Sequence, residues 1–286
     1  MDDEGRDADV LPWDDDEPDT RPIGGPIDLP PPRDPDDVQE PRPERWRTVV
    51  RSFGELFVTC GVVLLLFVFY ELYVTDLLNR HEQTQLTQQL YQQWSKEPSL
   101  PAASTAHGAV AAGQAFAILH IPRLGADYQR VVVEGTDQEQ LAQGPGHYVG
   151  TAFPGEQGNL ALAGHRVGKG SPFLELDALR PGDPIVVETA QSWFVYRVLG
   201  DRATGDFGTD PSGIPGQEIV PPSDLAEISS TPDAPASAAP TGAYLTLTTC
   251  HPRFSARQRL IIHARLDGEG TRKADQPNGP AALREH

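Results

Sequence analysis

The sequence has few cysteines and no excess of positive charge. Its 286 residues include only two cysteines, Cys60 and Cys250. Because Cys60 lies inside an apolar run, the two cannot pair, which excludes a disulfide framework and leaves a hydrophobic core as the source of stability. The net charge of −18 argues against nucleic acid as a partner. No acidic cluster or His/Cys spacing typical of a metal site is found, so we expect no metal and no cofactor.

Large apolar residues are almost missing from residues 1–45. This segment is rich in proline and holds sixteen acidic and five basic side chains, a local charge of −11. Such a segment cannot bury enough apolar surface to offset its ordering entropy, so we predict a disordered cytoplasmic tail. A partner-binding role for the tail stays open.

One long stretch lacks charge altogether. Residues 57–70 contain no charged side chain. Together with the apolar residues on either side, this stretch is long enough for a membrane-spanning helix. The basic residues that precede it are Arg42, Arg45, Arg47 and Arg51. Positive charge on this side predicts a cytoplasmic N-terminus and an exported remainder. We therefore expect a single-pass anchor in the cell membrane over residues 46–75.

Two alternatives for this stretch are weaker. A cleaved signal peptide disagrees with the roughly fifty preceding residues, and no small-x-small cleavage site follows in residues 71–76. A buried core helix would need a covering element, and nothing nearby in the sequence provides one.

The next segment, residues 76–114, is expected to be a helical stalk followed by a linker. It is rich in glutamine and places Leu78, Leu86, Leu90 and Trp94 on one stripe of a helix. The stripe would pack on the domain that follows or on a second copy of the chain. Residues 97–113, rich in Pro, Ala and Ser, are typical of a linker.

From residue 115 the pattern changes to short apolar runs separated by Gly/Pro turns, which favours a β-sandwich or a barrel. The expected strands are residues 116–121, 128–133, 159–163, 184–188, 193–199, 244–249 and 260–266. Residues 138–142 and 173–179 are expected to form short helical turns. We assign residues 115–268 to one extracellular domain, the candidate for any catalytic activity weighed below, and residues 269–286 to a disordered C-terminal tail.

Cys250 ends one of these strands, because Pro252 cannot continue a β-ladder. A lone strand cysteine is usually a small buried hydrophobe, but an unpaired thiol on an exported domain is a reactive group. Arg259 begins the next apolar run, so a nucleophile and a fixed cation are expected on the same rim. Such a pair suits acyl transfer, in which a thiolate attacks and a cation stabilises the oxyanion. Upstream, His165 offers a base after another apolar strand.

These motifs resemble the sortase family of cysteine transpeptidases. The sequence Ala-Gly-His165, followed far downstream by Thr-Leu-Thr-Thr-Cys250 and by Arg259 before an apolar strand, is similar to the family pattern. More narrowly, it is similar to the class E sortases of high-GC Gram-positive bacteria. The matching motifs occupy residues 118–125, 144–148, 164–166, 171–173, 179–183 and 219–222, in the family's order.

The resemblance implies an eight-stranded sortase-like β-barrel, mostly β with short helices, and three catalytic residues. Cys250 would attack the Thr–Gly carbonyl of a C-terminal sorting signal and form a thioacyl enzyme. His165 would protonate the departing amine, and Arg259 would stabilise the oxyanion. The partners would be secreted proteins with a Leu-Ala-x-Thr-Gly-like or Leu-Pro-x-Thr-Gly-like signal and an amine of a peptidoglycan precursor of the lipid II type.

Other residues compete for these roles. Arg253 and Arg257 are near Arg259, which we prefer because it directly precedes the apolar strand. His251 is unfavourable as the base, since consecutive strand residues point to opposite faces. We expect His147 and Thr249 to support the catalytic side chains or to contact the substrate, and His120 and His263 to be packing residues.

Three other functions are weighed against this hypothesis. A pilus-polymerising sortase would carry a lid with an Asp-Pro-aromatic motif, which does not precede residue 116. A cysteine peptidoglycan hydrolase or L,D-transpeptidase would more often have a Ser-x-Gly-Cys-like motif, which is absent. A non-enzymatic membrane scaffold would not depend on Cys250.

Overall fold

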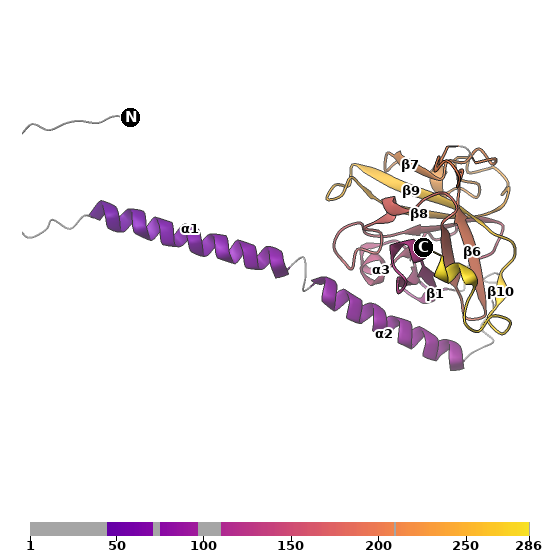
Figure 1. Cartoon of the computed structure of the whole chain (residues 1–286), viewed down its shortest axis with the longest axis horizontal. Coiled ribbons are helices and arrows are strands. Elements are labelled where there is room, and N and C mark those ends of the chain that lie inside the picture. Colours follow the sequence, from indigo (N-terminus) through magenta and orange to yellow (C-terminus); the bar gives the residue numbers. More distant parts are fainter. Residues whose placement is uncertain (1–44, 71–74, 97–109, 209, 286) are drawn as a thin grey trace, which may run out of the picture. The chain divides into compact units, whose positions relative to one another are not determined.

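The computed structural model describes residues 45–70, 75–96, 110–208 and 210–285 (Figure 1). The tail expected over residues 1–45, apart from its last residue, and residues 97–109 of the expected linker lie outside the described residues. The longer helices are α1 (Arg45–Phe69), α2 (Thr75–Lys96) and α3 (Gln138–Gln143). The strands are β1 (Ala115–His120), β2 (Gln129–Glu134), β3 (Gly146–His147), β4 (Gly158–Ala163), β5 (Pro184–Glu188), β6 (Ser192–Val198), β7 (Gln217–Val220), β8 (Ala243–His251), β9 (Gln258–Leu266) and β10 (Thr271–Arg272). The 3₁₀ turns are η3 (Pro122–Leu124), η4 (Leu176–Ala178), η5 (Ala226–Ile228) and η6 (Ala281–Arg284).

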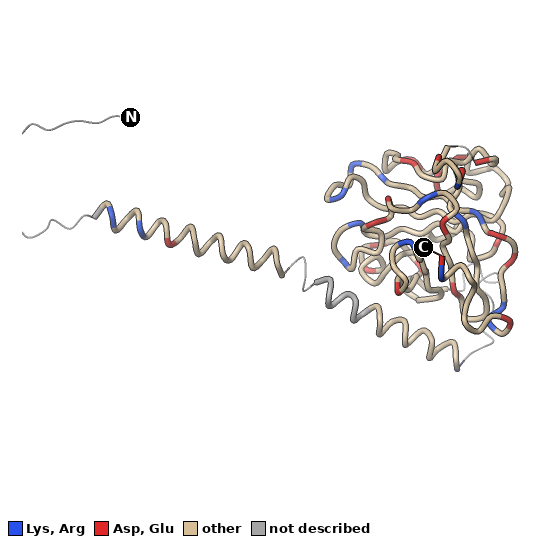
Figure 2. Tube along the Cα trace, viewed as in Figure 1, with Lys and Arg blue, Asp and Glu red and all other residues tan. Residues whose placement is uncertain are grey.

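Helix α1 is the apolar helix that the sequence predicts. Arg47 and Arg51 lie in its first two turns, and no charged residue follows Glu55 within the helix (Figure 2). Arg51 Nε and Glu55 Oε1 form an ion pair of 2.9 Å along the helix surface. By length and composition α1 could be a membrane span.

Eight strands close into a barrel. Their order around the barrel is β6-β5-β1-β2-β3-β4-β8-β9, and pairing of β9 with β6 closes the circle. Most neighbours are antiparallel, whereas β2–β3 and β4–β8 are parallel. Strands β7 and β10 lie outside the circle, on β9 and β6. Closure leaves no free edge among the eight barrel strands.

The predicted barrel is confirmed, and seven of its strands correspond to the apolar runs of the sequence. Alternate residues face the interior, as in β4, where Leu160 and Leu162 join the core, and in β8, where Leu245 and Leu247 do so. Strand β3 was not predicted, since two residues carry no alternating pattern. Its first residue must be glycine, because a Cβ on Gly146 would lie 2.2 Å from the Gly135 carbonyl oxygen. The helical turns predicted over residues 138–142 and 173–179 correspond to α3 and η4.

The stripe predicted on α2 packs on the barrel. Leu90 and Trp94 are buried, and with Leu86 they form a cluster with the face of β1 and β2 that points away from the barrel interior. Gln83 fixes the helix in register: its Oε1 accepts from Val131 N at 3.0 Å and its Nε2 donates to the Gln143 carbonyl. The sequence left open whether this stripe packs on the following domain or on a second copy of the chain. Its described side chains, Leu86, Leu90 and Trp94, pack on the barrel. Leu78 lies in the part of α2 whose side chains are not described.

A buried carboxylate joins α2, the barrel and the C-terminal segment. Glu188, at the end of β5, is 2% exposed. One of its oxygens accepts from Tyr91 and from His120, both at 2.9 Å, and the other pairs with Lys273 Nζ at 2.6 Å. Burial alone would raise the pKa of Glu188, but the hydrogen bonds from His120 and Lys273 outweigh burial and hold that pKa below its usual range. Ionised Glu188 therefore links Tyr91 of α2 and Lys273 of the C-terminal segment to the barrel.

The docking of α2 predicts a stability effect at Leu90. We expect Leu90→Ala to lower the free energy of unfolding by about 2–4 kcal/mol, because it removes buried methyl groups and leaves a cavity. Denaturant unfolding of a chain that begins at Thr75 measures this, with the exposed Gln89→Ala on the same helix as control. Equal stability of the two variants would contradict the docking of α2.

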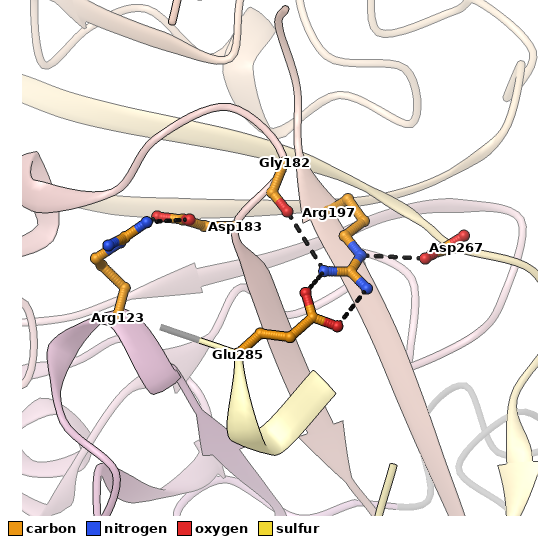
Figure 3. Close-up of polar contacts among 6 residues, drawn as sticks. All are labelled: Arg123, Gly182, Asp183, Arg197, Asp267 and Glu285. Atoms are coloured by element: carbon orange, nitrogen blue, oxygen red, sulfur yellow. Dashed lines mark hydrogen bonds and ion pairs between the residues drawn. The ribbon is translucent and has the colours of Figure 1, made fainter. Parts of the chain in front are cut away.

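The C-terminal segment differs from the disordered tail that the sequence predicts over residues 269–286. Strand β10 pairs with β6, and Ala282 in η6 is buried against Val186 and Trp193. Further along the chain, the Glu285 carboxylate accepts two hydrogen bonds from Arg197, from Nη1 at 2.5 Å and from Nη2 at 3.0 Å (Figure 3). The composition of this segment is typical of disorder, and its few apolar residues become significant only once the barrel provides a surface for them.

Candidate active site

Cys250 and Arg259 face each other across two neighbouring strands. Strands β8 and β9 are antiparallel, and Cys250 is directly opposite Arg259 in their register. Directly opposite residues have Cβ atoms about 4.5–5.5 Å apart. Pairing ends one step further, at His251 opposite Gln258, so both residues lie at the rim of the barrel. The structure therefore has the thiol and the guanidinium on one rim, as the sequence predicts.

Arg259 keeps donors available for a ligand. Its Nη1 donates to the carbonyls of Ala256 and Gln258, both at 3.1 Å, which hold the side chain against its own loop. Within the described residues, Nε and Nη2 make no such contact. The competitor Arg253 is engaged elsewhere, since its Nη2 pairs with Glu175 Oε2 at 2.8 Å.

The backbone of the β4–β8 pair brings His165 to the same rim. These strands are parallel, with Ala163 opposite Thr248. The alignment continues past β4, because Gly164 N donates to Thr248 O at 3.0 Å and Thr249 Oγ1 donates to Gly164 O at 2.8 Å. A Cβ on Gly164 would lie 2.5 Å from the Phe173 ring, so only glycine fits here.

A second contact lies on the other side of His165. Arg166 Nη1 donates to His251 Nδ1 at 3.0 Å. The two residues that flank His165 are thus bound to the two residues that flank Cys250: Gly164 to Thr249, and Arg166 to His251. This double connection puts His165 in register with Cys250.

The environment of His165 favours its neutral form. Burial, and then the positive charge of Lys169, hold the pKa of His165 below its ordinary value. At neutral pH the ring is therefore mostly uncharged. Its Nε2 is buried and has no hydrogen-bond partner within the described part of the chain. This nitrogen is therefore not committed to a partner in the described part of the chain.

The two supporting residues that the sequence predicts are both buried. His147 has no exposed surface and binds Glu134 Oε2 through Nδ1 at 2.7 Å. A side chain with no exposed surface cannot contact a substrate, so the structure argues against that part of the expectation for His147. Thr249 is 2% exposed and serves as the tie to Gly164.

One cluster of ionisable side chains was not predicted from the sequence, because its members are far apart along the chain. The potential ligand atoms of Glu218, Glu227, Asp233 and His263 lie within 4.8 Å of one another, so these residues could hold a cation. His263 Nε2 already pairs with Glu227 Oε2 at 2.9 Å and with Glu218 Oε1 at 3.3 Å. Burial would lower the pKa of His263, but the hydrogen bonds to the two glutamates outweigh it and raise that pKa. Burial raises the pKa of Glu227 to about 6. The raised pKa favours the positively charged form of His263, which neutralises part of the negative charge of these carboxylates.

A cavity beside α2 is separate from the catalytic rim. A cavity of about 600 Å³ lies between α2 and residues 124–130, and its lining includes none of His165, Cys250 and Arg259. The candidate active site is therefore defined by its side chains and their register rather than by this cavity.

A closed eight-stranded barrel with a cysteine, a histidine and an arginine at one rim defines a class of enzyme, the cysteine transpeptidases with a barrel fold. A sequence model of the Sortase domain matches residues 119–267, about half of the chain. The chain belongs to the sortase family, whose members are cysteine transpeptidases.

Individual relatives agree with the family match. The chain is 35% identical over 235 residues to sortase SrtE1 of Streptomyces coelicolor, a match that covers 80% of this chain and 60% of that protein. It is 28% identical over 225 residues to SrtE2 of the same organism, covering 76% and 81% of the two chains. The solved structure of the SrtF sortase from Corynebacterium diphtheriae has 41% identity and a TM-score of 0.57, and covers 64% of this chain and 98% of that one. The class E resemblance of the sequence is thus confirmed by its similarity to two proteins named as E-type sortases.

Proposed function

We propose that this chain cleaves secreted proteins at a C-terminal sorting signal and joins them to an amine of a cell-wall precursor. The signal is of the Leu-Ala-x-Thr-Gly or Leu-Pro-x-Thr-Gly type, cut between Thr and Gly. Membership of the sortase family and similarity to SrtE1 and SrtE2 support this substrate class.

In the first half-reaction neutral His165 accepts the proton of the Cys250 thiol, and the resulting thiolate attacks the threonine carbonyl carbon. The negative charge that develops on the carbonyl oxygen is stabilised by the free donors of Arg259. The carbon–nitrogen bond then breaks, protonated His165 gives its proton to the glycine amine, and a thioester to Cys250 remains.

The second half-reaction runs the same steps in reverse with a different amine. The incoming amine attacks the thioester carbonyl, and neutral His165 removes its extra proton. Cys250 leaves as a thiolate, and a new amide bond joins the protein to the precursor. The lowered pKa of His165 supports its role as a base in this step.

We further propose that α1 anchors the enzyme in the cell membrane, with the barrel on the extracellular side. Arg47 and Arg51 in the first turns of α1 support a cytoplasmic N-terminus, because positive charge is retained on that side. A lipid-linked precursor of the lipid II type fits such a location, because its amine would reach the thioester from the membrane surface and accept the protein chain.

The observation that carries the proposal is the pair of contacts around the histidine and the cysteine. Gly164 binds Thr249 and Arg166 binds His251, so the middle residues His165 and Cys250 share one register. A buried cysteine that only packs would have no need of a histidine aligned in this way.

The test is a cleavage assay with the purified full chain in detergent. Quenched peptides with Leu-Ala-x-Thr-Gly and Leu-Pro-x-Thr-Gly signals are incubated with and without a glycine-type amine, and the products are weighed by mass spectrometry. We expect cleavage between Thr and Gly and a new product that contains the amine. Absence of cleavage of both peptides, with Cys250 still reactive toward a thiol reagent, would instead favour an enzyme that acts directly on peptidoglycan.

A further inference from the structure

Arg166 is a buried charge beside the candidate active site with no role in the chemistry proposed above. It is 3% exposed. Its Nη2 pairs with Asp177 Oδ2 at 2.8 Å, and its Nη1 donates to His251 Nδ1 at 3.0 Å. Arg166 directly follows His165, and its guanidinium binds both Asp177 in η4 and His251, the residue that directly follows Cys250.

The contact with His251 has a defined polarity. A guanidinium only donates, so Nδ1 of His251 must accept, and the ring in this contact carries its proton on Nε2. Of the two ties that align the active-site loop, this one joins two side chains, whereas the Thr249 tie ends on the backbone of Gly164. Loss of the Arg166 side chain would remove the tie to the residue after Cys250, and would leave the Gly164–Thr249 tie and the hydrogen bond that Phe173 N donates to His165 O at 3.1 Å.

The burial of Arg166 is expensive for folding. Its Nε is buried and has no hydrogen-bond partner within the described residues. An unsatisfied buried donor destabilises the folded state. Removing one partner of an ion pair is strongly destabilising when the other charge stays buried, but the side chain of Asp177 is 41% exposed and stays in contact with solvent. Asp177 would keep a partner after such a change, because Arg253 Nη2 also lies 3.4 Å from its Oδ1. Folding alone therefore gives little reason for this arginine.

We propose that Arg166 is a positioning residue: by holding His251 and Asp177 together, it keeps His165 aligned with Cys250 for proton transfer. This inference rests on the proposed function, since it assigns His165 and Cys250 their catalytic roles. Arg166 itself exchanges no proton and binds no substrate. Its effect should appear in kcat, because a small misplacement of a proton donor slows the chemical step more than it weakens binding.

The test compares three variants of the full chain in the peptide assay. Arg166→Met should lower kcat by about 100-fold, with KM within about three-fold of the wild type and an unchanged or higher melting temperature. Arg166→Lys should recover part of the loss, to about 10-fold below wild type, since one ammonium can keep one of the two contacts but not both. Arg253→Met is the matched control: it removes the exposed partner of the same Asp177 and should leave kcat within about two-fold of wild type.

The possible results separate the two proposals. If the wild type cleaves neither peptide, the proposed function has failed. If the wild type is active and folded Arg166→Met keeps kcat within about three-fold, the positioning role is overturned and the proposed function stands. If Arg166→Met does not fold, Arg166→Lys decides: a folded lysine variant with wild-type kcat overturns the positioning role, and one with reduced kcat and unchanged KM supports it.

Discussion

Cys250→Ala is expected to lower kcat/KM for the sorting-signal peptide by at least about 10⁴-fold. Without the thiol no thioester can form, and the neighbouring side chains can only polarise the carbonyl. The fold should not change, because Cys250 lies half-buried at the rim and alanine is smaller and fits the same strand position. Melting temperature and peptide turnover are measured on the same preparation.

The chain provides its own control for this variant. Cys60 is the other cysteine and lies exposed in α1. Cys60→Ala should leave turnover unchanged and should remain labelled once by a thiol reagent, at Cys250. Residual turnover of Cys250→Ala above about one part in a thousand would show that another residue acts as the nucleophile.

Arg259→Lys is expected to lower kcat by about 10²- to 10³-fold with little change in KM. Lysine keeps the charge but loses the planar fork that can hold the loop carbonyls with Nη1 and present Nε and Nη2 to an oxyanion. Because the oxyanion exists only in the transition state, the loss should fall on kcat rather than on substrate binding. Steady-state kinetics of peptide cleavage separate the two parameters.

Arg257→Lys is the matched control, because Arg257 is exposed in the same loop two residues earlier. It should behave like the wild type. A similar loss in both variants would mean that arginine-to-lysine changes lower activity throughout this segment and that Arg259 has no specific role in stabilising the oxyanion.

The fold was largely predictable because a barrel strand buries alternate residues and leaves a pattern of period two. Leu245 and Leu247 in β8 are an example, since both join the core. The rim was predictable for a different reason: Pro252 directly follows the end of β8 and Arg259 is the second residue of β9, so the hairpin itself brings Cys250 opposite Arg259.

The remaining parts depend on contacts between distant segments. His263, expected to be a packing residue, lies among carboxylates that come from β7, η5 and the loop that follows. Arg166 belongs to a motif visible in the sequence, but its contact with His251 spans 85 residues and exists only after β4 and β8 align. No local pattern encodes such a pairing, so spacing alone could not reveal either one.

The anchoring of Glu188 limits how far the protein can be shortened. A chain cut to residues 115–268 would appear complete by the pattern of its strands. It would lack Tyr91 and Lys273, and the buried carboxylate would keep only His120 as a partner. Such a charge, left without its cation, is strongly destabilising. The two ends of the folded region are therefore interdependent: removing either one weakens the attachment of the other, and a soluble fragment fit for kinetics must retain both.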